Sequence, residues 1–126
     1  MSFWKKHVIE PALDAGIDEE IRSQLAVIAH EPSSAKAWFG LGSLYHVRGD
    51  KKKAMDCFLE SIKIDEHFSA AHVAIGRLYA VDGNIGLAWK SARQAERLGD
   101  SSLCEQLSRY TKPPATAESS EPSVQK

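Results

Sequence analysis

The chain has 126 residues, of which 16 are lysine or arginine and 17 are aspartate or glutamate, giving a formal net charge of -1. This length is enough for one domain with its own core. The near-neutral charge provides no overall basic field that could hold a phosphate backbone, so we expect no nucleic-acid partner.

The N-terminal segment does not match a secretion signal. Pro11, Asp14 and Asp18 fall where a signal peptide would need an apolar run. No stretch of the sequence approaches the roughly 18 uninterrupted apolar residues of a membrane-spanning helix. We therefore expect a soluble, cytoplasmic protein without membrane insertion, in which Cys57 and Cys104 are reduced thiols.

The most informative feature is an internal repeat. An offset of 34 residues aligns residues 35–68 with residues 69–102 without a gap. The identical pairs are Ala37 and Ala71, Gly42 and Gly76, Leu44 and Leu78, Tyr45 and Tyr79, Val47 and Val81, Gly49 and Gly83, and Ala54 and Ala88. The chain therefore contains two copies of one structural unit.

Each unit has the pattern of two helices joined by a turn, which we call its A helix and its B helix. In the first unit, Trp38, Leu41 and Tyr45 share one stripe of the A helix. Gly49 suits the left-handed conformation that ends a helix, and Asp50 suits the cap of the next one. The B helices carry small or apolar residues at helical spacing: Ala54, Phe58 and Ser61 in the first unit, and Ala88, Ala92 and Ala95 in the second.

These residues resemble the tetratricopeptide repeat (TPR), whose A helix has the pattern W-x₂-L-G-x₂-Y and whose B helix has an alanine and an aromatic residue. The matching residues are Trp38, Leu41, Gly42, Tyr45, Ala54 and Phe58, followed by Ile75, Gly76, Tyr79 and Ala88. The resemblance covers about residues 35–102. It implies an all-α fold, a right-handed α-α superhelix (solenoid) of helix-turn-helix hairpins.

The second unit departs from this pattern at the positions of large side chains. His72 stands at the position of Trp38, and Ala92 replaces the aromatic residue of the B helix. Because Trp89 lies one turn before Ala92, we predict that the indole of Trp89 is buried and fills the space of the missing aromatic ring.

The ends of the chain are expected to cap the repeats. We predict a helix interrupted or restarted at Pro11, a second helix beginning at Gly16 and Asp18, and a final helix with a capping box from Ser102 to Glu105. The predicted segments are N-terminal capping helices forming a degenerate repeat (1–34), one TPR (35–68), a second TPR (69–102), a C-terminal capping helix (103–112) and a disordered tail (113–126).

Residues that could perform catalysis or bind metal do not form a known arrangement. No two of the five histidines are spaced i, i+4, and there is no Cys-x-x-Cys motif. Neither cysteine has an evident histidine and orienting group. The run Lys51–Lys53 between Asp50 and Asp56 indicates the solvated start of a helix. We therefore expect no enzyme activity, no cofactor and no metal.

The resemblance places the functional surface on the A helices, which line the concave groove in TPR proteins. The corresponding residues are Lys36, Phe39, Ser43, His46, Val47, Ala70, Val73, Arg77, Ala80 and Val81. The set is largely apolar, which is typical of a binding surface, and Arg77 could hold a carboxylate of the partner. We predict an adaptor that binds a peptide or helix of a protein partner. A chaperone carboxylate clamp is disfavoured, because Phe39, Ser43 and Ala74 stand where that clamp needs lysine and asparagines.

Two alternatives stay open from the sequence. The chain could be a self-associating assembly or scaffold subunit, a homo-oligomer that uses the same face or the solenoid ends. The groove could also be covered by the N-terminal helix of the chain itself.

Overall fold

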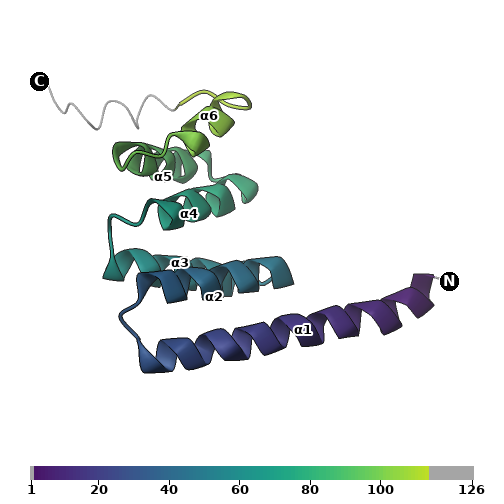
Figure 1. The fold of residues 1–126 in the computed structure, drawn as a ribbon. Coiled ribbons are helices and arrows are strands. Elements are labelled where there is room, and N and C mark those ends of the chain that lie inside the picture. Colours follow the sequence, from purple (N-terminus) through teal and green to yellow (C-terminus); the bar gives the residue numbers. More distant parts are fainter. Residues whose placement is uncertain (1, 114–126) are drawn as a thin grey trace, which may run out of the picture. The chain divides into compact units, whose positions relative to one another are not determined.

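The computed structural model describes the backbone of residues 2–113 and the side chains of residues 16–113. Within residues 2–113 the chain forms helices and no strand, as predicted (Figure 1). The helices are α1 (Ser2–His30), α2 (Ala35–Arg48), α3 (Lys51–Ile64), α4 (Ser69–Val81), α5 (Ile85–Arg97) and α6 (Ser102–Ser108). They form two compact units, Met1–Ile64 with α1 to α3 and Asp65–Lys126 with α4 to α6. The predicted tail lies outside the described residues, apart from Pro113.

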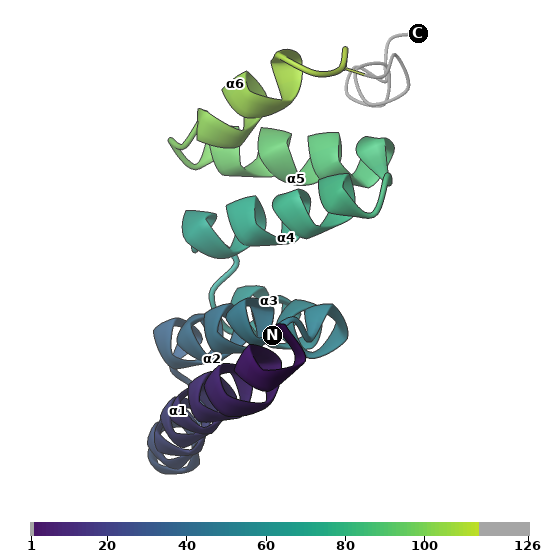
Figure 2. The same ribbon diagram turned by 90° about the vertical axis from the view of Figure 1, so that its right-hand side faces the viewer.

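In the first unit, α2 and α3 form a hairpin and α1 packs against α2 (Figure 2). The buried cluster of this unit consists of Ile21, Ile28, Ala37, Leu41 and Cys57. Two polar contacts fix the α1 to α2 packing. The Gln24 side chain donates from Nε2 to the carbonyl of Ala37 at 3.2 Å, and Arg48 forms an ion pair with Asp18 at 2.9 Å.

α1 is a single helix, so the prediction of an interruption at Pro11 and a new start at Gly16 and Asp18 is wrong. A proline removes one backbone hydrogen bond from a helix, and here the helix continues through it. Asp18 pairs with Arg48 of α2 and so has a tertiary role in place of the predicted helix start. α1 has 29 residues and α2 has 14, so the N-terminal half of α1 extends past the hairpin (Figure 1).

Replacing Gly16 with alanine tests the continuity of α1. A Cβ at this position meets no atom within 4 Å, and Gly16 is not among the glycines with positive φ. The Gly16→Ala variant should therefore be more stable by about 0.5–1 kcal/mol, because alanine has the higher helix propensity. Urea unfolding measures the change. A loss of stability would show that Gly16 occupies a helix boundary.

The turns between paired helices follow the predicted chemistry. Gly49 has φ 99° and Gly83 has φ 83°, which is the left-handed region that glycine favours. Asp50 caps α3, because its Oδ1 accepts a hydrogen bond from the backbone N–H of Lys53 at 3.3 Å. The predictions for Gly49 and Asp50 are confirmed.

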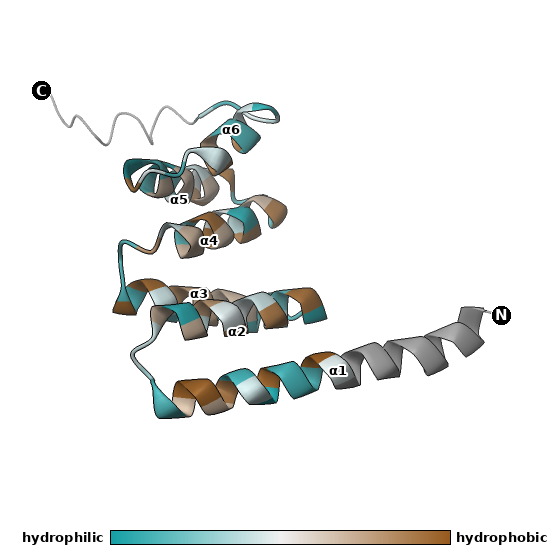
Figure 3. Cartoon of the chain, in the orientation of Figure 1, coloured by the Kyte–Doolittle hydropathy of each residue, from teal (hydrophilic) through white to brown (hydrophobic). Residues whose placement is uncertain are grey.

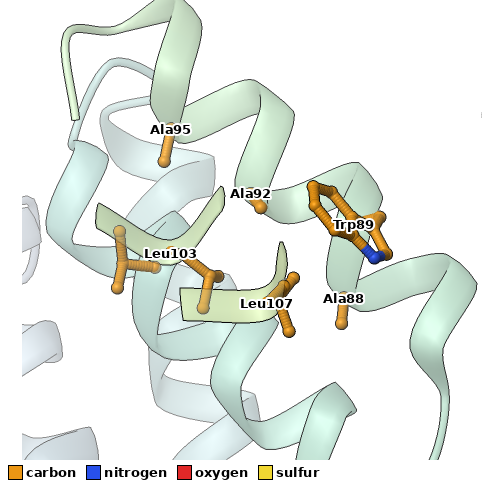
Figure 4. Packing of buried hydrophobic residues seen from close by; sticks show 7 residues of the cluster. Ala88, Trp89, Ala92, Ala95, Leu103 and Leu107 are labelled. Carbon is orange, nitrogen blue, oxygen red and sulfur yellow. The ribbon is translucent and has the colours of Figure 1, made fainter. Parts of the chain in front are cut away.

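In the second unit, α4 and α5 form the hairpin, and α6 packs on α5 and α4. The buried cluster consists of Val73, Ala88, Trp89, Ala92, Ala95, Leu103 and Leu107. Figure 4 shows the leucines of α6 facing the alanine side of α5, with the indole of Trp89 beside them. Small residues on α5 let a third helix approach closely, so α6 completes the core of this unit.

The two units have the same residue spacing, but different side chains pack against the equivalent glycines of their A helices. A Cβ on Gly42 would lie 2.6 Å from the ring of Phe58, whereas a Cβ on Gly76 would overlap Leu103 of α6. Trp89 is buried as predicted, with 3% of its surface exposed. The prediction that Trp89 fills the space of the missing aromatic ring is corrected at Gly76, because Leu103 is the side chain that occupies this position.

The start of α6 also differs from the predicted capping box. The helix begins at Ser102, so this residue lies one position inside the helix and cannot act as its cap. The N-cap residue is Ser101, and the residue before it, Asp100, accepts hydrogen bonds at Oδ1 from the backbone N–H of Ser102 at 3.0 Å and from its hydroxyl at 2.6 Å. These hydrogen bonds, first from the hydroxyl and then from the N–H, hold the pKa of Asp100 below its usual range.

Apolar and polar residues alternate along the helices (Figure 3). Consistent with this pattern, none of the helices in the described part of the chain is both long and apolar enough to cross a membrane.

Candidate functional site

The ten residues predicted to bind a partner divide equally between the two A helices. The α2 face consists of Lys36, Phe39, Ser43, His46 and Val47, and the α4 face consists of Ala70, Val73, Arg77, Ala80 and Val81. Because α2 and α4 belong to different units, each face is described within its own unit.

The α2 face presents apolar and basic side chains to solvent. Val47 is 70% exposed, and Lys36 and His46 are also exposed. Phe39 is partly buried, with its ring centroid 5.4 Å from that of Phe58 in α3 and the two planes tilted by 41°. The aromatic side chain is thus held from behind by the hairpin, so Phe39 is ordered before any partner binds.

α1 contacts α2 on a different side from this face. The contacts with residues of α1 described above go to Ala37 and Arg48 of α2, and helical spacing places these residues away from Phe39 and Ser43. The side chains of residues 2–15 lie outside the described residues, so coverage of the face by that segment stays a prediction.

The α4 face is less accessible than predicted. Val73 is only 6% exposed, because it packs in the cluster that includes Leu103 and Leu107 of α6. Arg77 is exposed, and its Nε donates a hydrogen bond to Oε1 of Gln106 in α6 at 3.3 Å. The prediction of Val73 as a surface contact is therefore wrong for this structure, and Arg77 already has a partner in α6.

The remaining residues of the α4 face are of two kinds. Ala70 and Ala80 are partly buried. Val81, which is equivalent to Val47, is 66% exposed at the end of α4. The two A helices thus end in equivalent exposed valines, and the middle of the α4 face is in contact with α6.

The aromatic position of the A helix has the same hydrogen bond in both units. Nε1 of Trp38 donates to the carbonyl of Pro32 at 3.0 Å, and Nε2 of His72 lies 3.0 Å from the carbonyl of Glu66. Each carbonyl is six residues before its ring, and the two pairs are related by the 34-residue offset. With the proton on Nε2, His72 donates as the indole does, which explains how histidine substitutes for tryptophan here.

Comparison with known families agrees with this geometry. Residues 35–68 match the family model described as tetratricopeptide repeat. Residues 35–68 therefore form a tetratricopeptide repeat. The matched residues coincide with the first predicted TPR and include α2 and α3.

The TPR fold also has counterparts among solved structures, with 57 matching chains. One is the crystal structure of MamA, with a TM-score of 0.63 and 24% sequence identity. The alignment covers 78% of this chain and 54% of the MamA chain, so this chain spans about half of the length of MamA. No curated protein shows significant sequence similarity to the chain. The likeness to MamA identifies the fold alone.

Cys57 and Cys104 are free thiols. Burial raises the pKa of Cys57 to about 11, and the carboxylates of Asp56 and Glu60 act in the same direction. The pKa of Cys104 is also raised, first by burial and then by the charge of Glu96, whose carboxylate accepts a hydrogen bond from the thiol at 3.7 Å. Both thiols therefore stay protonated near neutral pH.

The pH dependence of alkylation tests the raised pKa of Cys57. At pH 8 the thiol should react about 100-fold more slowly than a thiol of pKa 9, because two pKa units reduce the thiolate fraction by that factor. The rate should rise about tenfold per pH unit until the pH approaches the pKa of about 11. The same chain in urea provides the control. Reaction of Cys57 in the folded chain at the rate measured in urea would contradict the assignment.

Within residues 16–113, no group of three His, Cys, Asp or Glu side chains is arranged to hold a metal ion.

The sequence predicts that the helix with Leu103 and Leu107 covers the second unit, but sequence reasoning missed that this helix contacts the predicted binding face of α4. Leu103 and Gln106 reach Gly76 and Arg77, but nothing in the repeat pattern assigns them to that face. The available signal was the i, i+4 spacing of Leu103 and Leu107, which predicts an apolar stripe without specifying which helix it contacts.

Proposed function

We propose that this chain is a non-catalytic adaptor whose α2 face binds a peptide or helix of a protein partner. The TPR family and the fold support a protein-interaction or scaffold role. The observation that carries the proposal is that Val47 is exposed on the same helix as the ordered ring of Phe39, about two turns further along, and that Lys36 and His46 are exposed on this helix as well. An apolar patch with a polar rim is typical of a binding site. A cytoplasmic location stays a prediction from composition.

The charge of the α2 face supports an acidic partner segment. The α2 face includes Lys36 and His46, both exposed, and α2 contains no acidic residue. Opposite charge at the rim of an interface favours association and selects the orientation of the ligand. We therefore propose a partner segment with an apolar anchor for Phe39 and Val47, flanked by carboxylates.

Affinity capture with three variants tests this proposal. Phe39→Glu places a charge at the centre of the α2 face, and Val47→Glu does so at a side chain that is already exposed. Leu59→Glu makes the same change on α3 at a residue that is 37% exposed, and it provides the matched control. Partner recovery should fall at least about tenfold for the first two variants and stay unchanged for the control.

Helix content measured by circular dichroism shows which variants are folded. Undiminished recovery with folded Val47→Glu would contradict the proposal, even if Phe39→Glu fails to fold. If the chain captures only itself and its mass in solution increases with concentration, self-association replaces the adaptor role.

A further inference from the structure

The second hairpin is incomplete without a helix from outside it. In the first unit, Phe58 of α3 fills the space against Gly42 of α2, so the hairpin supplies its own side chain. In the second unit the position equivalent to Phe58 is Ala92, and Leu103 of α6 takes the place against Gly76. The α4–α5 hairpin therefore has a site that accepts a leucine from a third helix.

α6 uses two leucines and one polar contact to occupy this site. Leu103 and Leu107 are both buried, and their i, i+4 spacing places them on one side of the helix. Leu103 reaches Gly76 of α4, and Figure 4 shows Leu103 and Leu107 in one cluster with the alanines and Trp89 of α5. Gln106 lies beside them and accepts the hydrogen bond from Arg77 of the α4 face. The helix thus behaves as a ligand with two apolar anchors and one acceptor.

The length of α6 limits how firmly it can hold this position. It has 7 residues, and helices this short do not persist in water without tertiary contacts. Its helical structure and its contacts with the hairpin therefore form and break together, and such elements open locally before the rest of a domain unfolds. A longer helix with the same two anchors could make further contacts along α5.

We propose that α6 is an internal ligand of a helix-binding site on α4 and α5, and that an amphipathic partner helix displaces it. The displacing helix has two leucines four residues apart and a carboxylate or amide one residue before the second leucine. A carboxylate at that position forms a charge-assisted hydrogen bond with Arg77, which is stronger than the bond to Gln106. This inference rests on the proposed partner-binding function, because Val73 and Arg77 belong to the predicted binding face.

A labelled synthetic peptide with the sequence of residues 100–111 is the probe, and the full-length chain is the receptor. In the wild type the internal α6 competes at high effective concentration, so the peptide binds weakly. Leu107→Ala removes one anchor from the internal helix, and peptide affinity should increase at least about tenfold. Arg109→Ala changes an exposed residue after α6 and should leave the affinity unchanged. A peptide with alanine at both leucine positions should not bind.

A second variant keeps the test valid if Leu107→Ala disrupts the unit. Gln106→Ala removes the contact with Arg77 without changing a buried side chain, and it should increase peptide affinity by about three- to tenfold. Hydrogen exchange of α4 and α5 shows whether each variant is folded. No increase in affinity for either folded variant would overturn the proposal.

Different variants test partner binding by the α2 face and displacement of α6. Val47→Glu changes the α2 face in the other unit and should not alter peptide binding. Loss of partner capture with Val47→Glu, together with constant peptide affinity in all α6 variants, would support the adaptor and reject displacement of α6.

Discussion

Replacing Trp89 with alanine is expected to lower the free energy of unfolding by about 3–5 kcal/mol, as for other buried aromatic residues. The indole is almost fully buried among alanines of α5 and leucines of α6, and alanine neighbours cannot expand to fill the space. The guanidinium of Arg93 lies 5.7 Å from the ring centroid and would lose its cation–π contact. Urea unfolding measures the change. A loss below about 1 kcal/mol would contradict the packing of Trp89.

A conservative variant of Trp89 separates the contribution of the aromatic ring from that of the indole N–H group. The Nε1–H group of Trp89 is buried and has no hydrogen-bond partner in the described part of the chain. Trp89→Phe keeps an aromatic ring and removes this donor, so the expected loss is below about 1.5 kcal/mol. A loss equal to that of Trp89→Ala would show that a phenyl ring does not replace the packing of the larger indole ring.

The second large effect is expected at the two glycines of the A helices. Gly42→Ala and Gly76→Ala should each lower stability by about 1–3 kcal/mol, because the added Cβ would overlap a buried side chain. Alanine normally stabilises a helix, so these changes should have the opposite sign from Gly16→Ala.

Double variants test which side chain each glycine contacts. Phe58→Ala should lessen the added cost of Gly42→Ala, and Leu103→Ala should lessen that of Gly76→Ala, because each makes room for the new methyl group. The crossed combinations should be additive. Additive effects in the matched pairs, or stabilisation by either glycine substitution alone, would show that close contact does not explain these glycines.

The repeat and its turns could be predicted from the sequence because they depend on local chemistry. Gly49 and Asp50 act on the backbone next to them, so a single sequence suffices to assign the end of one helix and the cap of the next. The 34-residue offset adds a second copy of the same pattern. The position of His72 was predicted for the same reason, although its hydrogen bond to Glu66 required the structure.

The structure of α1 and the position of α6 could not be predicted in the same way, because they depend on contacts between helices that are distant in sequence. The residue types of Gly16 and Asp18 predict the start of a helix. In the structure α1 is continuous through both residues, and Asp18 forms an ion pair with Arg48 of α2. The burial of Val73 likewise depends on where α6 packs. Sequence periodicity shows that Leu103 and Leu107 share a stripe, but it does not show which surface that stripe covers.

Photo-crosslinking from the α2 face tests the central claim of partner binding most directly. A photoreactive amino acid placed at Val47 lies on the exposed face, and the same amino acid at Leu59 of α3 provides the control. Adaptor function through α2 predicts that a partner protein is crosslinked from position 47 and not from position 59. Crosslinks from position 59 alone, or none to another protein from position 47 in a folded chain, would contradict it.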